Sequence, residues 1–282
     1  MKAELSQRQT YSEVRPVDPT SPFRVLWNNR ALIRRLVARE LQARYRGSML
    51  GLGWAVVMPL GMALMYTFVF GSILKTRWGG IDGSTESFAA FMLSGLVLHQ
   101  FLGESIGRAP SLVLENQNYV TRVVFPLEVL PAVIVGVGSV GAAIGLALLL
   151  ALTTVVSGLP PATALLAPLV LMAMVPILLG LVWMMAAVGV FVRDLGQIMP
   201  VALSVLFFLG PVIYPRSSVP APFDTLIVLN PITIPIEATR ALIFGHPFPV
   251  EAALIYVGAS LVICWIGFAL FARLRRAFAD VL

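Results

Sequence analysis

The chain has 282 residues, of which 58% are hydrophobic and 12% are charged, and its mean hydropathy is +0.88. Because soluble domains carry roughly a quarter charged residues, this composition shows that water is not the chain's only solvent. The net charge of +6 fits the retention of Lys and Arg in cytoplasmic loops, so it does not require nucleic-acid binding. The single cysteine, Cys264, excludes an intramolecular disulfide and a cysteine-based metal cluster.

The N-terminal part divides into two segments. Residues 1–29 combine prolines with Ser, Thr and charged residues, a composition that predicts a flexible cytoplasmic tail. Over residues 30–46 the apolar positions recur every four residues and arginines gather on the opposite side, which predicts a basic helix lying in the membrane surface. The apolar positions are Ile33, Val37, Leu41 and Tyr45.

Two charged residues of this surface helix fall within its apolar arc. Glu40 and Arg44 are one turn apart, so we expect them to neutralise each other as an i,i+4 pair. Two interpretations of the helix remain open at this point. It is either solvated and paired with lipid headgroups, or it docks a cytoplasmic protein.

Six stretches with little or no charge follow, each sufficient for the ~20 residues that cross a bilayer. The sequence therefore predicts an all-α integral membrane protein with a single transmembrane domain over residues 30–282. All but four of the 20 Lys and Arg residues then fall on one side, which places both termini in the cytoplasm. The expected transmembrane helices lie near residues 51–74, 88–106, 129–154, 164–191, 195–215 and 252–272.

The third expected helix carries Gly141 and Gly145 at GxxxG spacing. Small residues at this spacing allow close helix contact, either within one bundle or between two copies of the chain. The mixed composition of residues 107–128 predicts a cytoplasmic connection with room for short helices.

Residues 216–250 are too apolar for an exposed loop. We expect two short helices, near 222–229 and 233–244, that re-enter the outer leaflet as a periplasmic gate, with Asn230 and Pro231 forming the turn between them.

The second of these helices carries Glu237 and Arg240 three residues apart. This pair is expected either to stabilise its own helix or to clamp a second copy of the chain.

Residues for catalysis or nucleotide binding are scarce. The two histidines, His99 and His246, lie on segments of different character, and neither Lys2 nor Lys75 has a phosphate-loop context. Glu104 is the main charge expected at membrane depth, which disfavours a proton-coupled carrier. The sequence therefore predicts no catalytic residue, no metal site and no ATP site.

Five groups of short motifs occur in order along the chain. They are Arg39–Trp54 with Pro59 and Phe68–Gly71; Asn118 with Phe125–Pro131; Arg193, Asp194 and Gln197; Pro211–Pro215; and Asn230, Pro231, Glu237, Ala238 and Arg240. Together they resemble the motifs of ABC-2 type polysaccharide export permeases over residues 30–272. The Phe-Pro and Tyr-Pro forms resemble O-antigen and teichoic acid exporters more than capsule exporters. After Gly95-Leu96, His99-Gln100-Phe101 departs from the aromatic pair often found in this family.

The resemblance implies a homodimer in the bacterial cytoplasmic (inner) membrane, surrounded by lipids, whose channel passes a lipid-linked polysaccharide. Two copies of a separate ATP-binding subunit, holding ATP and Mg, would supply the energy. Neither a cofactor in this chain nor a nucleic-acid partner is expected.

Three sets of functional residues follow from the motifs and the expected topology. Contacts with the ATP-binding subunit are expected at residues 30–46 and 107–122, specifically at Arg39, Glu40, Arg44, Arg46, Asn118 and Arg122. Aromatic rings suit the apolar C–H faces of sugars, so the expected channel residues are Tyr66, Phe70, Phe207, Phe208 and Tyr214. The expected gate residues are Asn230, Pro231, Glu237 and Arg240.

Tyr66 and Phe70 are expected to share one helical face. Two other functions remain as alternatives. One is an ABC-2 exporter of capsule, teichoic acid or a small molecule, and the other is a membrane glycosyltransferase or acyltransferase.

Overall fold

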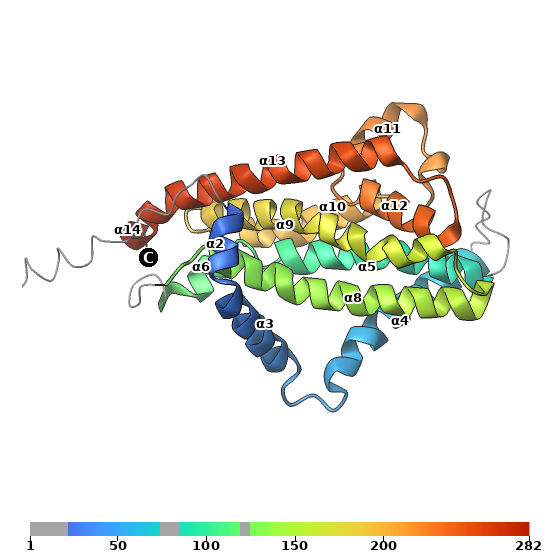
Figure 1. Ribbon diagram of the computed structural model, residues 1–282, viewed down its shortest axis with the longest axis horizontal. Helices are drawn as coiled ribbons and strands as arrows, with labels where there is room; N and C mark the ends of the chain where they lie inside the picture. The colour runs from blue at the N-terminus through green and yellow to red at the C-terminus, as the bar shows by residue number, and fades with distance from the viewer. Residues whose placement is uncertain (1–21, 74–84, 119–124, 282) are drawn as a thin grey trace, which may run out of the picture.

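The computed structural model describes residues 22–73, 85–118 and 125–281, and the regular elements in these ranges are all helical (Figure 1). The α-helices are α2 (Pro22–Asn28), α3 (Arg30–Tyr45), α4 (Trp54–Tyr66), α5 (Thr85–Ile106), α6 (Leu112–Glu115), α8 (Val129–Ser157), α9 (Ala167–Gly189), α10 (Leu195–Leu209), α11 (Ala221–Val228), α12 (Thr233–Phe244), α13 (Val250–Leu274) and α14 (Phe278–Val281). Short 3-10 turns are η1 (Gly51–Gly53), η3 (Ala162–Leu166), η4 (Arg216–Ser218) and η5 (Arg275–Ala277), and η2 (Thr67–Ile73) is a π-helix.

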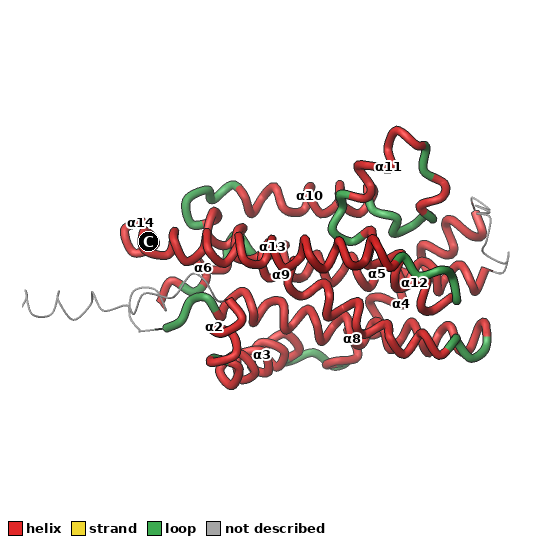
Figure 2. Tube along the Cα trace, turned by 45° about the horizontal axis from the view of Figure 1, so that its top comes forward, coloured by secondary structure: helices red, strands yellow, loops and turns green. Residues whose placement is uncertain are grey.

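The long helices run side by side along the long axis of the molecule (Figure 1). The end that carries α2, α6 and α14 is called the proximal end. The opposite end, where α8 turns into α9 beside α12, is called the distal end. Figure 2 shows α2 and α14 near the same end of the molecule.

Four helical stretches are long and apolar enough to cross a membrane, which confirms an all-helical membrane protein. The bent pair α11–α12 supplies a fifth candidate. The two remaining predicted spans are shorter apolar helices, Trp54–Val69 and Leu195–Leu209. The four long stretches are Phe88–Ile106, Val129–Ser157, Ala162–Gly189 and Val250–Ala277.

The two shorter helices differ from the predicted ranges 51–74 and 195–215 for local reasons. The first passes into the π-helix η2 directly after Tyr66, and α10 ends before Gly210, whose backbone is extended. Regular α-helix therefore covers only part of each predicted span.

Close helix contacts depend on glycine. A Cβ atom on Gly267 would lie 2.2 Å from the Gly180 carbonyl oxygen, so α9 and α13 pack backbone against backbone. A Cβ atom on Gly145 would lie 2.8 Å from a methyl group of Val97, and Gly141 lies beside Glu104. The GxxxG face of α8 therefore contacts α5 of the same chain, which is the intramolecular alternative.

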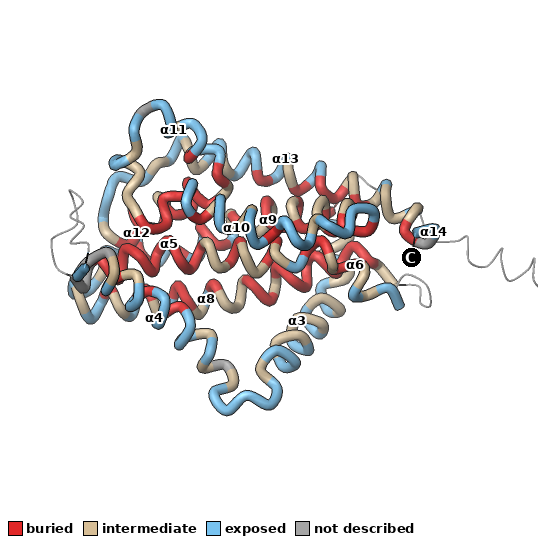
Figure 3. Tube along the Cα trace, turned by 180° about the vertical axis from the view of Figure 1, so that it is seen from behind, coloured by how far each residue is buried: buried red, intermediate tan, exposed pale blue. Residues whose placement is uncertain are grey.

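The buried residues follow the centres of α5, α8 and α9, whereas α3, α4 and the outer side of α13 are largely exposed (Figure 3). The helices α3 and α4 diverge from the bundle as a V (Figure 1). Exposed apolar side chains cover α4, and this surface suits lipid or another apolar partner better than water. They include Trp54, Val56, Val57, Met58, Met62, Leu64 and Met65.

The flexible tail predicted for residues 1–29 differs from the structure over its last part, since Pro22–Asn28 forms α2. Val25 and Leu26 pack against the core, and this burial offsets the entropy cost of ordering the helix. Residues 1–21 lie outside the described residues.

A buried ion pair joins the start of α8 to the C-terminal turn. Glu128 is fully buried, and its carboxylate accepts a hydrogen bond from Arg275, 147 positions later in the chain. The indole N–H of Trp183 donates to the Glu128 carbonyl oxygen at 3.1 Å. These contacts tie α8, α9 and η5 together at the proximal end.

The two short helices predicted before the last span are confirmed. α11 and α12 meet at 88°, and the predicted turn residues Asn230 and Pro231 lie between them. The predicted burial of their apolar residues holds for most of α12 but for α11 only at Ile227, since Leu226 and Leu229 are exposed. The reason is that α12 packs on the bundle, whereas α11 projects beyond it (Figure 1).

Candidate functional site

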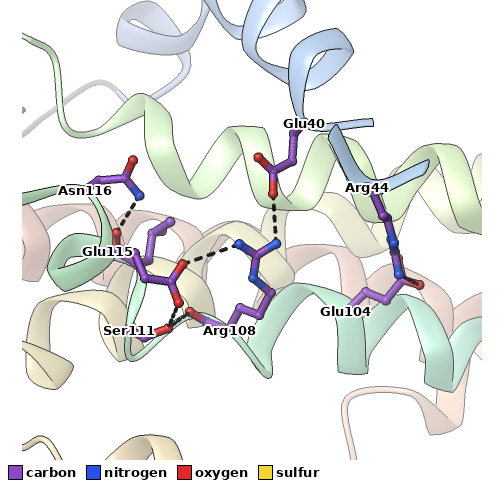
Figure 4. A network of polar contacts seen from close by, with 8 residues as sticks. Glu40, Arg44, Glu104, Arg108, Ser111, Glu115 and Asn116 are labelled. Carbon is purple, nitrogen blue, oxygen red and sulfur yellow. Dashed lines mark hydrogen bonds and ion pairs between the residues drawn. The ribbon is translucent and has the colours of Figure 1, made fainter. Parts of the chain in front are cut away.

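The first candidate site is a network of ion pairs at the proximal end (Figure 4). Arg44 of α3 donates two hydrogen bonds to the Glu104 carboxylate of α5, at 2.9 and 3.0 Å. Arg108, just after α5, contacts Glu40 of α3 at 2.9 Å and Glu115 of α6 at 3.4 Å. We call these five residues the α3–α5–α6 network, because they join those three helices.

The charge of Glu40 is among the causes that raise the pKa of Arg44, as the expected partial neutralisation requires, but the two side chains form their ion pairs elsewhere. Each forms its ion pair with a residue of the neighbouring segment, because α3 lies across the end of α5 and offers shorter distances there. The hydrogen bond to Glu104 raises the pKa of Arg44 above its ordinary value, and the one to Glu40 does the same for Arg108. Both arginines therefore stay charged at every physiological pH.

The exposure of this network sets its energetic weight. The Arg44 and Arg108 side chains are 43% and 58% exposed, so each pair contributes about 0–1 kcal/mol. Apolar contact adds to it, because Gly136 of α8 leaves space for Val37 of α3. The described contacts thus hold α3 beside α5, α6 and α8 through exposed ion pairs and one apolar contact.

The other predicted coupling residues are not part of this network. Arg39 and Arg46 are exposed and form no ion pair within the described part of the chain. Asn118 is exposed beyond α6. Arg122 lies outside the described residues.

Sequence reasoning missed Arg108 and Glu115 as partners and singled out Glu104 only as a sparse charge. One signal was available. A carboxylate inside an apolar span requires a partner, and Arg44 is an arginine within the apolar arc of the preceding helix. The pairing itself joins residues 60 positions apart, which no local pattern reveals.

The second candidate site is an aromatic cluster on α4, α5 and α10. Phe207 is the centre of the cluster, and its ring centroid lies 5.9 Å from Tyr66, 5.0 Å from His99 and 5.2 Å from Phe208. Phe208 is exposed, and its carbonyl oxygen accepts a 2.8 Å hydrogen bond from the Tyr214 hydroxyl. Four of the five predicted channel residues are thus brought together with His99.

The predicted sharing of one helical face by Tyr66 and Phe70 stays a prediction, because the side chain of Phe70 lies outside the described residues. The backbone between them changes from the α-helix α4 to the π-helix η2 at Thr67. At the position where the sequence departs from the family motif, the ring of His99 packs on Phe207 and its Nε2 lies 3.2 Å from the Leu203 carbonyl oxygen.

The third candidate site is Arg240 at the distal end. Its side chain is 4% exposed and contacts three segments. It donates to Ser94 of α5 at 3.1 Å and to the Val212 carbonyl oxygen at 3.0 Å, and its guanidinium stacks 3.5 Å above the Phe91 ring centroid. The ion pair with Glu237 is longer, at 3.4 Å. The structure therefore places Arg240 in contacts with its own chain, the local alternative of the two considered.

The turn before α12 is held by Asn230. Its side-chain amide donates to the Leu206 carbonyl oxygen at 2.7 Å, and its Oδ1 accepts from the Ile232 N–H at 3.2 Å. This arrangement is an Asx turn, which positions Pro231 and begins α12 against α10. The turn before α12 and α12 itself are thus attached to the bundle at Asn230 and at Arg240.

The described residues contain no group of three His, Cys, Asp or Glu side chains placed to hold a metal ion. The chemistry of the three sites consists of ion pairs, ring surfaces and buried hydrogen bonds.

Comparison with known proteins identifies the family. A family described as "ABC-2 type transporter" matches residues 31–244 of this chain, which is most of its length. The chain belongs to the ABC-2 type transporter family. It is a multi-pass membrane subunit of a transporter and not an enzyme. ATP binds to a partner ATP-binding subunit. The permease subunits of this family need no cofactor of their own.

Named relatives extend over nearly the whole chain. The "O-antigen export system permease protein RfbA" of Myxococcus xanthus is 30% identical over 260 residues, covering 91% of this chain and 97% of that protein. An RfbA protein of Klebsiella pneumoniae is 24% identical, covering 86% and 92%. The "Polysialic acid transport protein KpsM" of Escherichia coli is 24% identical, covering 87% and 94%.

Proposed function

We propose that this chain is the permease of an exporter that moves a lipid-linked, O-antigen-like polysaccharide across the bacterial inner membrane. The observation that carries the proposal is the similarity to an O-antigen export permease over 91% of the chain. A capsule-type polymer is the second candidate, favoured by the more distant similarity to a polysialic acid transport protein.

In this proposal the functional unit is a dimer of the chain with two ATP-binding subunits. The exposed apolar surface of α4 supports the presence of a second copy of the chain, which would cover this surface. A polar polymer needs a passage closed off from lipid, and one exposed helix cannot enclose such a passage. α2 and α14 lie at the same end as the exposed arginines, which supports cytoplasmic termini under the positive-inside rule.

The path is proposed to pass the aromatic cluster. Sugar C–H groups can pack on the ring faces of Tyr66, Phe207 and Phe208. The Tyr214 hydroxyl lies beside these rings, because it donates a hydrogen bond to the Phe208 carbonyl oxygen. α12, attached through Asn230 and Arg240, would close the outer end until polymer enters.

Coupling to ATP hydrolysis is proposed at the proximal end. Arg39, Arg46, Asn118 and the segment containing Arg122 would contact the ATP-binding subunit. The α3–α5–α6 network would then pass the displacement to α5, whose His99 touches the aromatic cluster.

The proposal is tested by deleting the gene in the bacterium that carries it. We expect surface polysaccharide to disappear and lipid-linked polymer to accumulate in the inner membrane, and both effects to reverse when the chain is restored. Sugar analysis of the accumulated polymer distinguishes O-antigen-like from capsule-type glycan. Unchanged surface polysaccharide in the deletion strain would contradict the proposal, and native mass measurement of the purified complex checks the expected two-plus-two composition.

A further inference from the structure

A cavity of about 650 Å³ lies at the distal end, between the α8–α9 turn, α12 and the Pro215–Ser217 segment. This volume falls within the roughly 300–1,000 Å³ of small-molecule sites. It lies apart from the aromatic cluster, whose residues do not line it. The lining residues used below are Ser157, Ser217, Glu237, Phe244 and His246.

Glu237 offers unused hydrogen-bonding capacity in this distal cavity. Its carboxylate is 31% exposed, and the contact found for it in the described segments is the 3.4 Å ion pair with Arg240. Arg240 in turn is held by Ser94 and backbone carbonyl groups, so the carboxylate has a fixed neighbour. The exposed hydroxyl groups of Ser157 and Ser217 add donors and acceptors on the facing walls.

The charges in and beside the cavity are balanced, which indicates a neutral ligand. Arg216 lines the cavity but makes two 2.7 Å hydrogen bonds to Asp224. Arg240 is paired with Glu237. Both arginines that line the cavity are thus paired with carboxylates, so a phosphate or carboxylate ligand would find no unpaired cation among the described lining residues. Hydroxyl groups, which both donate and accept, match this set of groups.

One side of the cavity is an apolar wall. The rings of Phe244 and His246 lie 6.5 Å apart between centroids, and the rings of Pro161 and Pro247 continue the same lining. Such surfaces pack against the C–H face of a sugar ring, while its hydroxyl edge reaches the polar groups. Carboxylate, hydroxyl and aromatic ring together are suited to a pyranose.

The walls are held in place before any ligand arrives. The Thr163 hydroxyl donates to the Leu242 carbonyl oxygen at 2.8 Å and joins the α8–α9 connection to α12. Gly158 and Gly245 have φ angles of +84° and +75°, which allow the sharp turns on either side of the cavity. Little conformational entropy is therefore lost when a ligand binds.

We propose that the distal cavity binds a short pyranose segment of the exported glycan, as a site separate from the channel. This inference rests on the proposed function and adds a place where the emerging polymer is held at the outer end. Retention there would oppose backward sliding of the polymer between cycles of ATP hydrolysis.

The first experiment measures binding without transport. The purified chain is placed in phosphatidylcholine nanodiscs, and saturation-transfer NMR is recorded with methyl glycosides of glucose, galactose, mannose, N-acetylglucosamine and rhamnose. We expect transfer to at least one glycoside, and affinity reduced roughly tenfold by Glu237→Gln or by His246→Ala. Phe248→Ala is the matched control, because Phe248 is exposed beside the cavity but does not line it.

The second experiment obstructs the cavity in cells. Ser157→Cys and Val155→Cys are each labelled with a bulky, membrane-impermeant maleimide; Val155 is 84% exposed on the same helix and does not line the cavity. Cys264, the one natural cysteine, is buried. We expect labelling to lower surface polysaccharide for Ser157→Cys and to leave Val155→Cys unaffected.

The outcomes separate this inference from the proposed function. Normal export by labelled Ser157→Cys, or glycoside binding unchanged by both cavity variants, would overturn the glycan site while export itself remains. Absence of transfer to every glycoside would also overturn it, and would leave a lipid headgroup or a protein partner for the cavity. If export stays normal in both labelled variants and in the deletion strain as well, the result contradicts the proposed function instead.

Discussion

Arginine side chains join helices at both ends of the molecule, under opposite conditions. At the proximal end Arg44 and Arg108 are largely exposed and each pairs with carboxylates of other helices. At the distal end Arg240 is almost completely buried and is saturated by a ring, a hydroxyl group and backbone carbonyl groups. Exposed pairs are screened by water and break at little cost, whereas a buried cation cannot leave its acceptors cheaply. The comparison suggests that the proximal contacts move during transport and that the Arg240 contacts stay fixed.

The largest effect is expected from Arg240→Met. Removal of the guanidinium leaves buried carbonyl groups and the Ser94 hydroxyl without their donor, and it should lower stability by about 3 kcal/mol. Arg240→Lys should lie between this variant and the natural chain, because an ammonium group lacks the planar fork. The measurement is the unfolding midpoint in detergent, with the exposed Arg193→Met as control, expected within about 0.5 kcal/mol. Equal losses for Arg240→Met and Arg193→Met would remove the distinction between the two ends.

A second effect is expected where α5 meets the segment that Arg240 holds. A Cβ atom on Gly95 would lie 2.5 Å from the Val212 carbonyl oxygen, so Gly95→Ala should cost about 1–3 kcal/mol by overpacking. Gly103→Ala on the same helix is the matched control, because its Cβ atom would lie 3.9 Å from the nearest side chain. That variant should be neutral or slightly stabilising. The same unfolding assay decides, and a harmless Gly95→Ala would show that this contact adapts.

A third prediction concerns the proximal network, where function should change more than stability. Arg44→Glu places two carboxylates together and should lower glycan-stimulated ATP hydrolysis severalfold, with a stability change of only about 1 kcal/mol. Adding Glu104→Arg restores opposite charges and should restore hydrolysis. The assay uses the chain reconstituted in vesicles with its ATP-binding subunit. A double variant as inactive as Arg44→Glu alone would argue against transmission through this pair.

The smallest effect on stability is expected from Arg39→Glu, within about 0.5 kcal/mol, because this side chain is exposed. Its effect should instead appear in association with the ATP-binding subunit, measured by co-purification and by ATP hydrolysis. The amount of chain in the membrane serves as control. Normal association together with normal hydrolysis would exclude Arg39 from the interface.

The sequence was informative where structure depends on neighbours along the chain. Prolines and glycines divided the apolar runs near the observed helix ends, and Asn230-Pro231 marked the turn between α11 and α12. The extent of α4 could not be predicted, because the change from α- to π-helical hydrogen bonding at Thr67 has no pattern in hydropathy. The formation of α2 could not be predicted either, because it depends on Val25 and Leu26 contacting a core built from helices distant in the sequence.

The candidate sites divide in the same way. Tyr66, Phe207 and Phe208 were chosen for their chemistry, and the fold brings them together around Phe207, but only the structure added the contact of His99 with Phe207. Local reasoning paired Glu40 with Arg44 because one helical turn separates them. In the structure Arg44 contacts Glu104, 60 positions away, and Glu40 contacts Arg108, 68 positions away. Electrostatic pairing is decided by three-dimensional distance, which sequence spacing does not contain.

The Glu128–Arg275 pair has a consequence for biosynthesis. During translation the segment with Glu128 leaves the ribosome long before Arg275, which comes at the very end of the last long helical stretch. Until that stretch is inserted, the carboxylate has no cation to meet, so a nascent or truncated chain carries an unmatched charge at a helix boundary. We therefore expect truncation before Arg275 to destabilise the fold, because it removes the cation from a buried carboxylate.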